Sequence, residues 1–181
     1  MNVPLPTAAV NFGYLSAVEL PELGYFGGYL LVSQLGRPLE FHCTAPVRPS
    51  RAQEILYGPT LQPYLLGEQI AGTLLAKARV KPQIILTDQS SALCHRVKLD
   101  MPLVYWRLAD LANSVADSIL IADHAFELPA GFDADRDSAS RLLTTLSQHV
   151  DLPEPFTRIH DAIREAHRIG ESSSEAHSEA A

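Results

Sequence analysis

Residues 25–47, Tyr-Phe-Gly-Gly-Tyr-Leu-Leu-Val-Ser-Gln-Leu-Gly-Arg-Pro-Leu-Glu-Phe-His-Cys-Thr-Ala-Pro-Val, contain two strand-like runs around a short loop. The first run is apolar on both faces, and the second alternates apolar and polar residues. This pattern predicts a β-hairpin whose first arm lies centrally in a sheet. On the second arm we expect Leu39, Phe41 and Cys43 on the buried face, and the polar residues between them on the other face.

The segments on either side of this hairpin extend the sheet. Residues 11–20 alternate as a strand does and end at Pro21, so they predict a strand before the hairpin. The pair Gly27-Gly28 lets another segment approach the hairpin backbone closely, or lets the strand bend. After the hairpin, Ser50 and Gln53 form a capping-box pattern at the start of a short helix.

The rest of the chain alternates helical and strand patterns, with no internal repeat. The fold class is therefore α/β: a single domain with a mixed sheet, an N-terminal hairpin and helices packed on the sheet. We expect an N-terminal arm over residues 1–10, the domain over 11–169 and a disordered acidic tail over 170–181. Further strands are predicted at 83–88, 101–106 and 118–122, and helices at 51–57, 61–79, 138–150 and 156–169.

Composition excludes some classes of function. A net charge of −7 and a pI near 5.4 argue against a general nucleic-acid or membrane-surface binder. The N-terminus lacks a signal-peptide pattern, and no apolar stretch is long enough for a membrane helix. Two cysteines do not make a disulfide framework, so we expect a cytoplasmic protein with reduced thiols. Glycine-rich phosphate loops, dinucleotide fingerprints and nucleophile elbows are absent from the sequence.

Acidic residues follow several predicted strands. Asp88 and Asp123 end apolar strands, and Glu19 lies near the end of the first strand. Carboxylates that converge at strand ends can hold Mg²⁺ or Mn²⁺, and such ions can activate water for phosphodiester cleavage. As a metal site we therefore consider Asp88 and Asp123, with Glu19 as a third catalytic acid. The simpler alternative is that these aspartates cap turns.

The order of strand, Gly-Gly-Tyr hairpin, helix and then Ile-Ile-Leu-Thr-Asp-Gln-Ser at 84–90 resembles the ribonuclease H-like superfamily over residues 11–92. The resemblance implies a catalytic acid on the first strand, often another on the first helix, and an aspartate ending the fourth strand. Asp88 matches that aspartate. Glu19 could match the first acid, where the family normally has aspartate, and neither Glu54 nor Glu68 can be chosen as the helical acid. A degenerate, non-catalytic member is an equal alternative.

Cysteine and histidine occur as two neighbouring pairs, His42-Cys43 and Cys94-His95. Neighbours on a strand point to opposite faces, so His42 and Cys43 do not suit one zinc ion, although one residue from each pair could. Cys94 or Cys43 could also serve as a thiol nucleophile with a histidine base, or be a small core residue. On the last helix, His160 is interpreted as part of a solvated face, together with His167 seven residues later.

Two classes of function remain. The first is a non-enzymatic module that binds a protein partner or itself, without a cofactor, for which the apolar hairpin offers an edge strand. The alternative is a metal-dependent phosphodiesterase or nuclease that uses Asp88, Asp123 and Glu19 with Mg²⁺ or Mn²⁺. The enzyme needs at least three carboxylates near a common point, whereas the module needs an exposed apolar patch.

Overall fold

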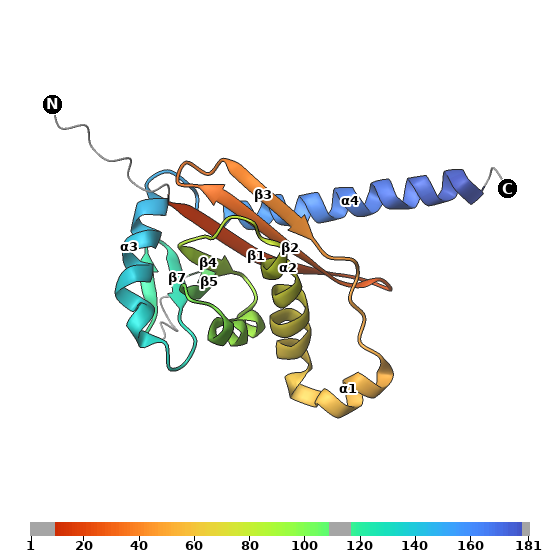
Figure 1. Ribbon diagram of the computed structural model, residues 1–181, viewed down its shortest axis with the longest axis horizontal. Coiled ribbons are helices and arrows are strands. Elements are labelled where there is room, and N and C mark those ends of the chain that lie inside the picture. The colour runs from red at the N-terminus through yellow and green to blue at the C-terminus, as the bar shows by residue number, and fades with distance from the viewer. Residues whose placement is uncertain (1–9, 109–116, 179–181) are drawn as a thin grey trace.

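The computed structural model describes residues 10–108 and 117–178, with side chains described as far as residue 168. A seven-stranded mixed sheet with the order β3-β2-β1-β4-β5-β7-β6 crosses the molecule, and helices cover both faces (Figure 1). This confirms the α/β class, the mixed sheet and the N-terminal hairpin. The strands are β1 (Asn11–Leu20), β2 (Gly24–Ser33), β3 (Pro38–Cys43), β4 (Ile84–Thr87), β5 (Leu103–Leu108), β6 (Ile119–Ile121) and β7 (His124–Glu127).

The order of elements implied by the ribonuclease H-like resemblance is present. β1, β2 and β3 form an antiparallel meander, and β4 then pairs with β1 in parallel. β2 lies between β1 and β3, which confirms that the first arm of the hairpin is central. The resemblance of residues 11–92 is therefore confirmed at the level of the fold.

The buried face of β3 was predicted wrongly. Leu39 and Phe41 are 51% and 39% exposed, and Cys43 is also exposed, whereas Glu40 lies on the more buried face. The Glu40 carboxylate accepts hydrogen bonds from the backbone N–H groups of Arg79 and Val80. The chain at 79–80 therefore covers the polar face of β3, and the apolar face of this edge strand is left open.

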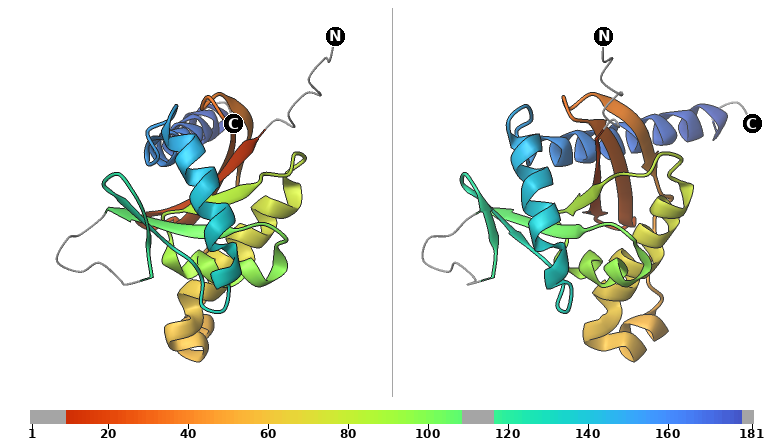
Figure 2. Two further views of the ribbon diagram at one scale, coloured as in Figure 1. Left: turned by 90° about the vertical axis from the view of Figure 1, so that its left-hand side faces the viewer. Right: turned by 60° about the vertical axis from the view of Figure 1, so that its left-hand side comes forward.

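Two hydrophobic clusters fill the space on the two faces of the sheet. The alternation along each strand divides the residues between them, as Phe12 and Leu15 on β1 illustrate. Phe12 packs with α3 (Arg136–Ser147) and α4 (Glu154–Ser178), and Leu15 packs with the segment Pro63–Lys77. Figure 2 shows these two helical layers on opposite sides of the sheet. The other helices are α1 (Arg51–Tyr57), η1 (Gly58–Thr60), η3 (Ser90–Lys98) and η4 (Asp133–Asp135).

Gly27 and Gly28 allow both layers to touch β2. A Cβ added to Gly27 would lie 2.1 Å from Ile70 Cγ2, and one added to Gly28 would lie 2.3 Å from Ile159 Cγ2. Ile70 and Ile159 lie on opposite faces of the sheet, in the two separate clusters. The expected close approach to this backbone is therefore made by a helix on each side.

The predicted helix over 61–79 differs from the observed one. It consists of a π-helix, η2 (Pro63–Ala71), followed by α2 (Gly72–Lys77). A Cβ on Gly67 would lie 2.1 Å from Cys94 Sγ. Gly67 thus makes room for the 3-10 helix η3. The predicted cap of α1 is confirmed, because Ser50 and Gln53 bond reciprocally.

The remaining differences lie at element ends. The hairpin partner β7 was not predicted, and α4 continues to Ser178, beyond the helix end expected at residue 169. The alanine and glutamate residues in 170–178 favour a helix, and a single glycine at 170 weakens it without ending it. Residues 1–9 of the predicted arm lie outside the described residues, as do residues 109–116. Within 10–108 and 117–178, every helix is too short or too polar to span a bilayer.

Candidate functional site

Ser16, in the middle of β1, and Asp88, directly after β4, come together where the parallel pairing of the two strands ends. In the parallel pair the last matched residues are Leu15 and Thr87, so Ser16 and Asp88 are the next residues on neighbouring strands. His160 reaches the same point from α4, which lies on the Phe12 face of the sheet. These three side chains, from segments 72 and 144 residues apart, form the candidate site.

The distances within the site are short. Ser16 Oγ lies 2.7 Å from Asp88 Oδ1 and 2.8 Å from Oδ2, and 2.7 Å from His160 Nε2. His160 Nε2 is 3.3 Å from Asp88 Oδ2. Ser16 is 1% exposed, while the side chains of Asp88 and His160 are 13% and 29% exposed. The serine is therefore buried beneath a carboxylate and an imidazole that both reach solvent.

The direction of the hydrogen bonds decides what this cluster can do. The Ser16 hydroxyl donates to the Asp88 carboxylate, so its oxygen accepts from the N–H of His160 Nε2. Activation of a serine nucleophile requires the opposite arrangement, in which the imidazole accepts the hydroxyl proton. In its observed form the cluster is a closed polar network.

Asp88 has a further side-chain partner. Gln89 Nε2 lies 3.2 Å from Asp88 Oδ1 and 3.3 Å from the Ala17 carbonyl oxygen. The following 3-10 helix, η3, begins with Gln89 as its N-terminal cap residue and has no side-chain cap. Asp88 therefore binds neighbouring side chains, and the alternative in which it caps the next turn is not supported.

The other two predicted acids lie elsewhere. Glu19 is three positions from Ser16 on β1, so the alternation of a strand puts it on the opposite face. There it lines a pocket of about 470 Å³ together with Glu54 and Arg48. Asp123 is exposed in the turn between β6 and β7, and both β5 and β7 separate it from Asp88's strand.

These positions bear on the predicted metal site. Among the described residues, no group of three or more histidine, cysteine, aspartate or glutamate side chains is arranged to hold a metal ion. Asp88, Asp123 and Glu19 are therefore not brought together. The donors at the cluster are one carboxylate, one imidazole and one hydroxyl, whereas Mg²⁺ and Mn²⁺ prefer several oxygen ligands. This donor set does not fit a two-ion nuclease centre.

Within the described residues, the two cysteine–histidine pairs do not form a metal site either. Cys94 Sγ lies 3.5 Å and 3.3 Å from the carbonyl oxygens of Pro63 and Ser91, and partial burial raises the pKa of its thiol. Burial lowers the pKa of the neighbouring His95. His42 bonds Glu40, with 2.6 Å between His42 Nε2 and Glu40 Oε1. These contacts are typical of structural residues and argue against a reactive thiolate.

Ser16 and His160 were missed as site residues. Ser16 is the polar residue within an apolar face of β1 that also contains Phe12 and Tyr14. His160 follows Phe156 by four positions and precedes Ile163 by three, so it belongs to the apolar stripe of α4. The interpretation of His160 and His167 as a solvated face is wrong, because His167 stacks on Phe26 at 5.6 Å between ring centroids.

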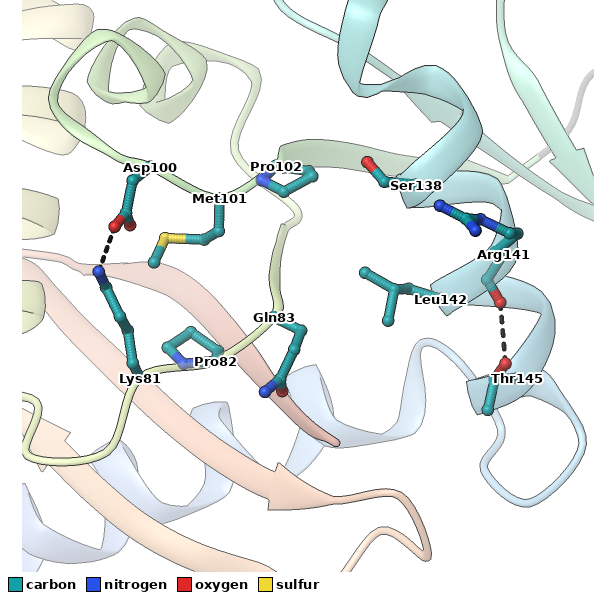
Figure 3. Close-up of a pocket in the computed structure, with 10 residues that line it drawn as sticks. All are labelled: Lys81, Pro82, Gln83, Asp100, Met101, Pro102, Ser138, Arg141, Leu142 and Thr145. Carbon is teal, nitrogen blue, oxygen red and sulfur yellow. Dashed lines mark hydrogen bonds and ion pairs between the residues drawn. The ribbon is translucent and has the colours of Figure 1, made fainter. Parts of the chain in front are cut away.

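A separate pocket of about 540 Å³ lies at the opposite ends of β4 and β5 (Figure 3). Gln83, Pro102 and Leu142 line it, and the ion pair between Lys81 and Asp100 lies at one side. Gln83 precedes β4 whereas Asp88 follows it, so the pocket and the Ser16 cluster are separated by the length of the strand. None of the predicted site residues lines this pocket.

No protein-family model and no curated protein matches this sequence. The chain is similar to the crystal structure of human ENDOV, with a TM-score of 0.46 and 16% identity, over 91% of this chain and 87% of that chain. It is also similar to Ciona intestinalis Endonuclease V in complex with a 24mer DNA containing an inosine followed by a ribo-adenosine. That match has a TM-score of 0.35 and 13% identity over 57% of this chain, which spans about half (48%) of the Ciona chain.

Proposed function

We propose that this chain is a non-catalytic module, built on a ribonuclease H-like fold, that binds a protein partner or a second copy of itself. The observation that carries the proposal is that Ser16 stands opposite Asp88 at the end of the central parallel pair. The resemblance implies a carboxylate on the first strand, for which Glu19 was the candidate, and Glu19 lies on the opposite face. The β1 residue beside Asp88 is a serine, whose hydroxyl donates a hydrogen bond to Asp88 and offers no negative charge to a cation.

The occupancy of Asp88 supports the same proposal. Its carboxylate accepts from Ser16 and Gln89 and lies 3.3 Å from His160. A cation at this point would have to displace these contacts, and one remaining carboxylate would compensate only part of its charge. The cluster around Asp88, as described, therefore lacks the negative charge that a two-ion phosphodiester mechanism uses.

The apolar surface is the second line of support. Large apolar side chains are exposed on the β2–β3 hairpin and on α1, and binding modules commonly present such patches. Leu35, Leu39 and Phe41 belong to the hairpin, and Ile55 and Leu56 belong to α1. A cytoplasmic location stays a prediction.

Thermal melting with and without Mn²⁺ tests this proposal, because an ion that binds only the folded state raises the melting temperature. We expect no Mn²⁺-dependent shift for the wild type, and a lower melting temperature for Asp88→Asn with or without Mn²⁺. Asp123→Asn is the matched control, since Asp123 is exposed in a turn. A Mn²⁺ shift that is present in the wild type and absent in Asp88→Asn would contradict the proposal.

The second candidate function is the metal-dependent phosphodiesterase or nuclease. It is favoured by the partial exposure of Asp88 and His160, which lets an ion from solvent reach both groups. In that function Asp88 is the Mg²⁺ or Mn²⁺ ligand, with His160 beside it, while Asp123 and Glu19 lie too far from Asp88 to share its ion. Incubation of the wild type and Asp88→Asn with single- and double-stranded nucleic acid and Mn²⁺, followed by measurement of cleavage, distinguishes the enzyme from the non-catalytic module. If the wild type cleaves the nucleic acid and Asp88→Asn does not, the enzyme is the correct function and the non-catalytic module is wrong.

A further inference from the structure

The outer edge of β3 has free backbone groups in a defined pattern. In an antiparallel pair, residues alternate between those that exchange backbone hydrogen bonds and those that do not. The bond from Thr44 N–H to the Gly27 carbonyl identifies Gly28–Cys43 and Leu30–Phe41 as pairs that do not exchange bonds. The N–H and C=O groups of Phe41 and Cys43 therefore point away from β2. Within the described chain, no other segment forms backbone hydrogen bonds with them.

The side chains on this edge divide into an apolar and a charged face. Leu39, Phe41 and Cys43 are exposed on the face that carries α4. On the other face, Glu40 and His42 lie two residues apart, with 2.6 Å between Glu40 Oε1 and His42 Nε2. An edge strand with open hydrogen-bonding groups and an exposed aromatic residue is a template for another strand.

We propose that β3 pairs with β3 of a second copy of this chain, antiparallel, with Phe41 opposite the second copy's Phe41. This inference rests on the part of the proposed function in which the chain binds a second copy of itself. The pairing joins the two sheets into one continuous sheet. The two Phe41 rings pack between the α4 helices of the two copies, and Leu39 of each copy packs against Cys43 of the other.

Charge complementarity selects this register. The outward groups belong to alternate residues, so the pairing can shift only in steps that keep Phe41 opposite an odd-numbered residue. With Phe41 opposite Phe41, all five residues 39–43 are paired, and the imidazole of each His42 lies opposite the Glu40 carboxylate of the other copy, to which it can donate a hydrogen bond. A shift that places Leu39 opposite Phe41 pairs only residues 39–41 and brings Glu40 opposite Glu40, and like charges directly opposite are destabilising. A shift the other way pairs only residues 41–43 and brings His42 opposite His42, so Glu40 loses its partner.

Other features limit the strength of the association. Pro38 starts β3 and has no N–H, so it confines the pairing to residues 39–43. Each copy carries a net charge of −7, and the resulting repulsion is screened by salt. We therefore expect a reversible dimer that forms at micromolar concentrations and is strengthened by added salt.

Sedimentation velocity of the full chain over a concentration series tests the dimer. We expect the wild type to shift from monomer to dimer, and Phe41→Glu to weaken the association at least about tenfold, which is about 1.4 kcal/mol. Leu120→Glu is the matched control: it removes an even more exposed apolar side chain from β6, the strand at the other edge of the sheet, and should leave the association unchanged. A wild type that stays monomeric at all concentrations, or an equal effect of both variants, would overturn the proposal.

Oxidative cross-linking tests the register without relying on a destabilising charge. Opposed residues that exchange hydrogen bonds have Cα atoms about 5.5 Å apart, which a disulfide can span. With Cys43 and Cys94 replaced by serine, Phe41→Cys should form a cross-linked dimer and His42→Cys should not. Leu39→Cys should cross-link only where Cys43 is retained. Cross-linking of His42→Cys as fast as that of Phe41→Cys would overturn the register.

The outcome for the dimer is separable from the outcome for the proposed function. A chain that stays monomeric, and that neither responds to Mn²⁺ nor cleaves nucleic acid, would exclude the dimer and keep the non-catalytic module. A chain that dimerises through Phe41 and also cleaves nucleic acid through Asp88 would keep the dimer and exclude the non-catalytic module.

Discussion

Ser16 Oγ lies 2.7 Å and 2.8 Å from the two carboxylate oxygens of Asp88, so one hydroxyl is shared between both oxygens. The serine is buried, and its own oxygen is 2.7 Å from His160 Nε2. A strand, a neighbouring strand and a distant helix are thus joined through one side chain. Ser16 therefore links β1, the end of β4 and α4 through its single hydroxyl group.

Replacing Ser16 tests this structural role. In Ser16→Ala the carboxylate of Asp88 and the imidazole of His160 lose their shared partner, and we expect unfolding free energy to fall by about 1–3 kcal/mol. Urea unfolding monitored by circular dichroism measures the change. Ser147→Ala, at an exposed serine that bonds within α3, is the control. A Ser16→Ala variant as stable as the control would show that the network contributes nothing to stability.

The close approach of α4 to β2 gives a second prediction. A Cβ at Gly28 would lie 2.3 Å from Ile159 Cγ2, which is closer than atoms can pack, so Gly28→Ala should lower stability by about 1–3 kcal/mol. Ile159→Ala removes that Cγ2 atom, so the double variant should lose less stability than the sum of the losses of the two single variants. Urea unfolding of the two single variants and the double variant measures the coupling. Additive losses would contradict the packing described.

Gly72 provides the opposite case. It is helical, and an added Cβ would have His95 Cε1 at 3.5 Å as its neighbour, which is an ordinary contact. Alanine is favoured over glycine inside a helix, so we expect Gly72→Ala to raise stability by up to about 1 kcal/mol. A higher melting temperature in a thermal scan confirms it. A loss as large as that of Gly28→Ala would show that the helix is more tightly packed at this point than the contact implies.

His95 predicts a pH dependence. Burial holds its pKa below the ordinary value in the folded state, with a further contribution from Lys98. The unfolded chain therefore binds the proton more readily, so this contribution to stability is present above about pH 6.5 and is lost as the pH falls. Urea unfolding between about pH 7 and pH 5 should show a shallower decline for His95→Gln than for the wild type. Parallel declines would exclude His95 as a cause.

Most of the fold can be predicted from the sequence because local pattern and burial agree. The apolar run at 29–32 is central, and Ser50 and Gln53 cap α1 as their spacing indicates. The pattern misleads at Leu39 and Phe41, because alternation identifies two faces without identifying which one is covered. That choice depends on the distant residues Arg79 and Val80, which bond Glu40.

The candidate site could be predicted only in part. Asp88 was identified from its place after an apolar strand, but its partners depend on the strand register and on a helix 72 residues later in the chain. The structure separates Glu19 from the cluster because it and Ser16 differ by an odd number of positions on one strand, and the sequence does not indicate which of the two lies beside Asp88. His160 was misplaced because its seven-residue spacing from His167 was weighed more than its spacing from Phe156 and Ile163.

Calorimetric titration of the wild type with Mn²⁺, beside the same titration of Asp88→Asn, tests the central claim most directly. The claim is that Asp88 is held by Ser16 and His160 and is not a metal ligand. We predict no saturable Mn²⁺ binding by the wild type, and the same trace for Asp88→Asn. Stoichiometric binding by the wild type that disappears in Asp88→Asn would contradict the claim and assign this site to a metal-dependent enzyme.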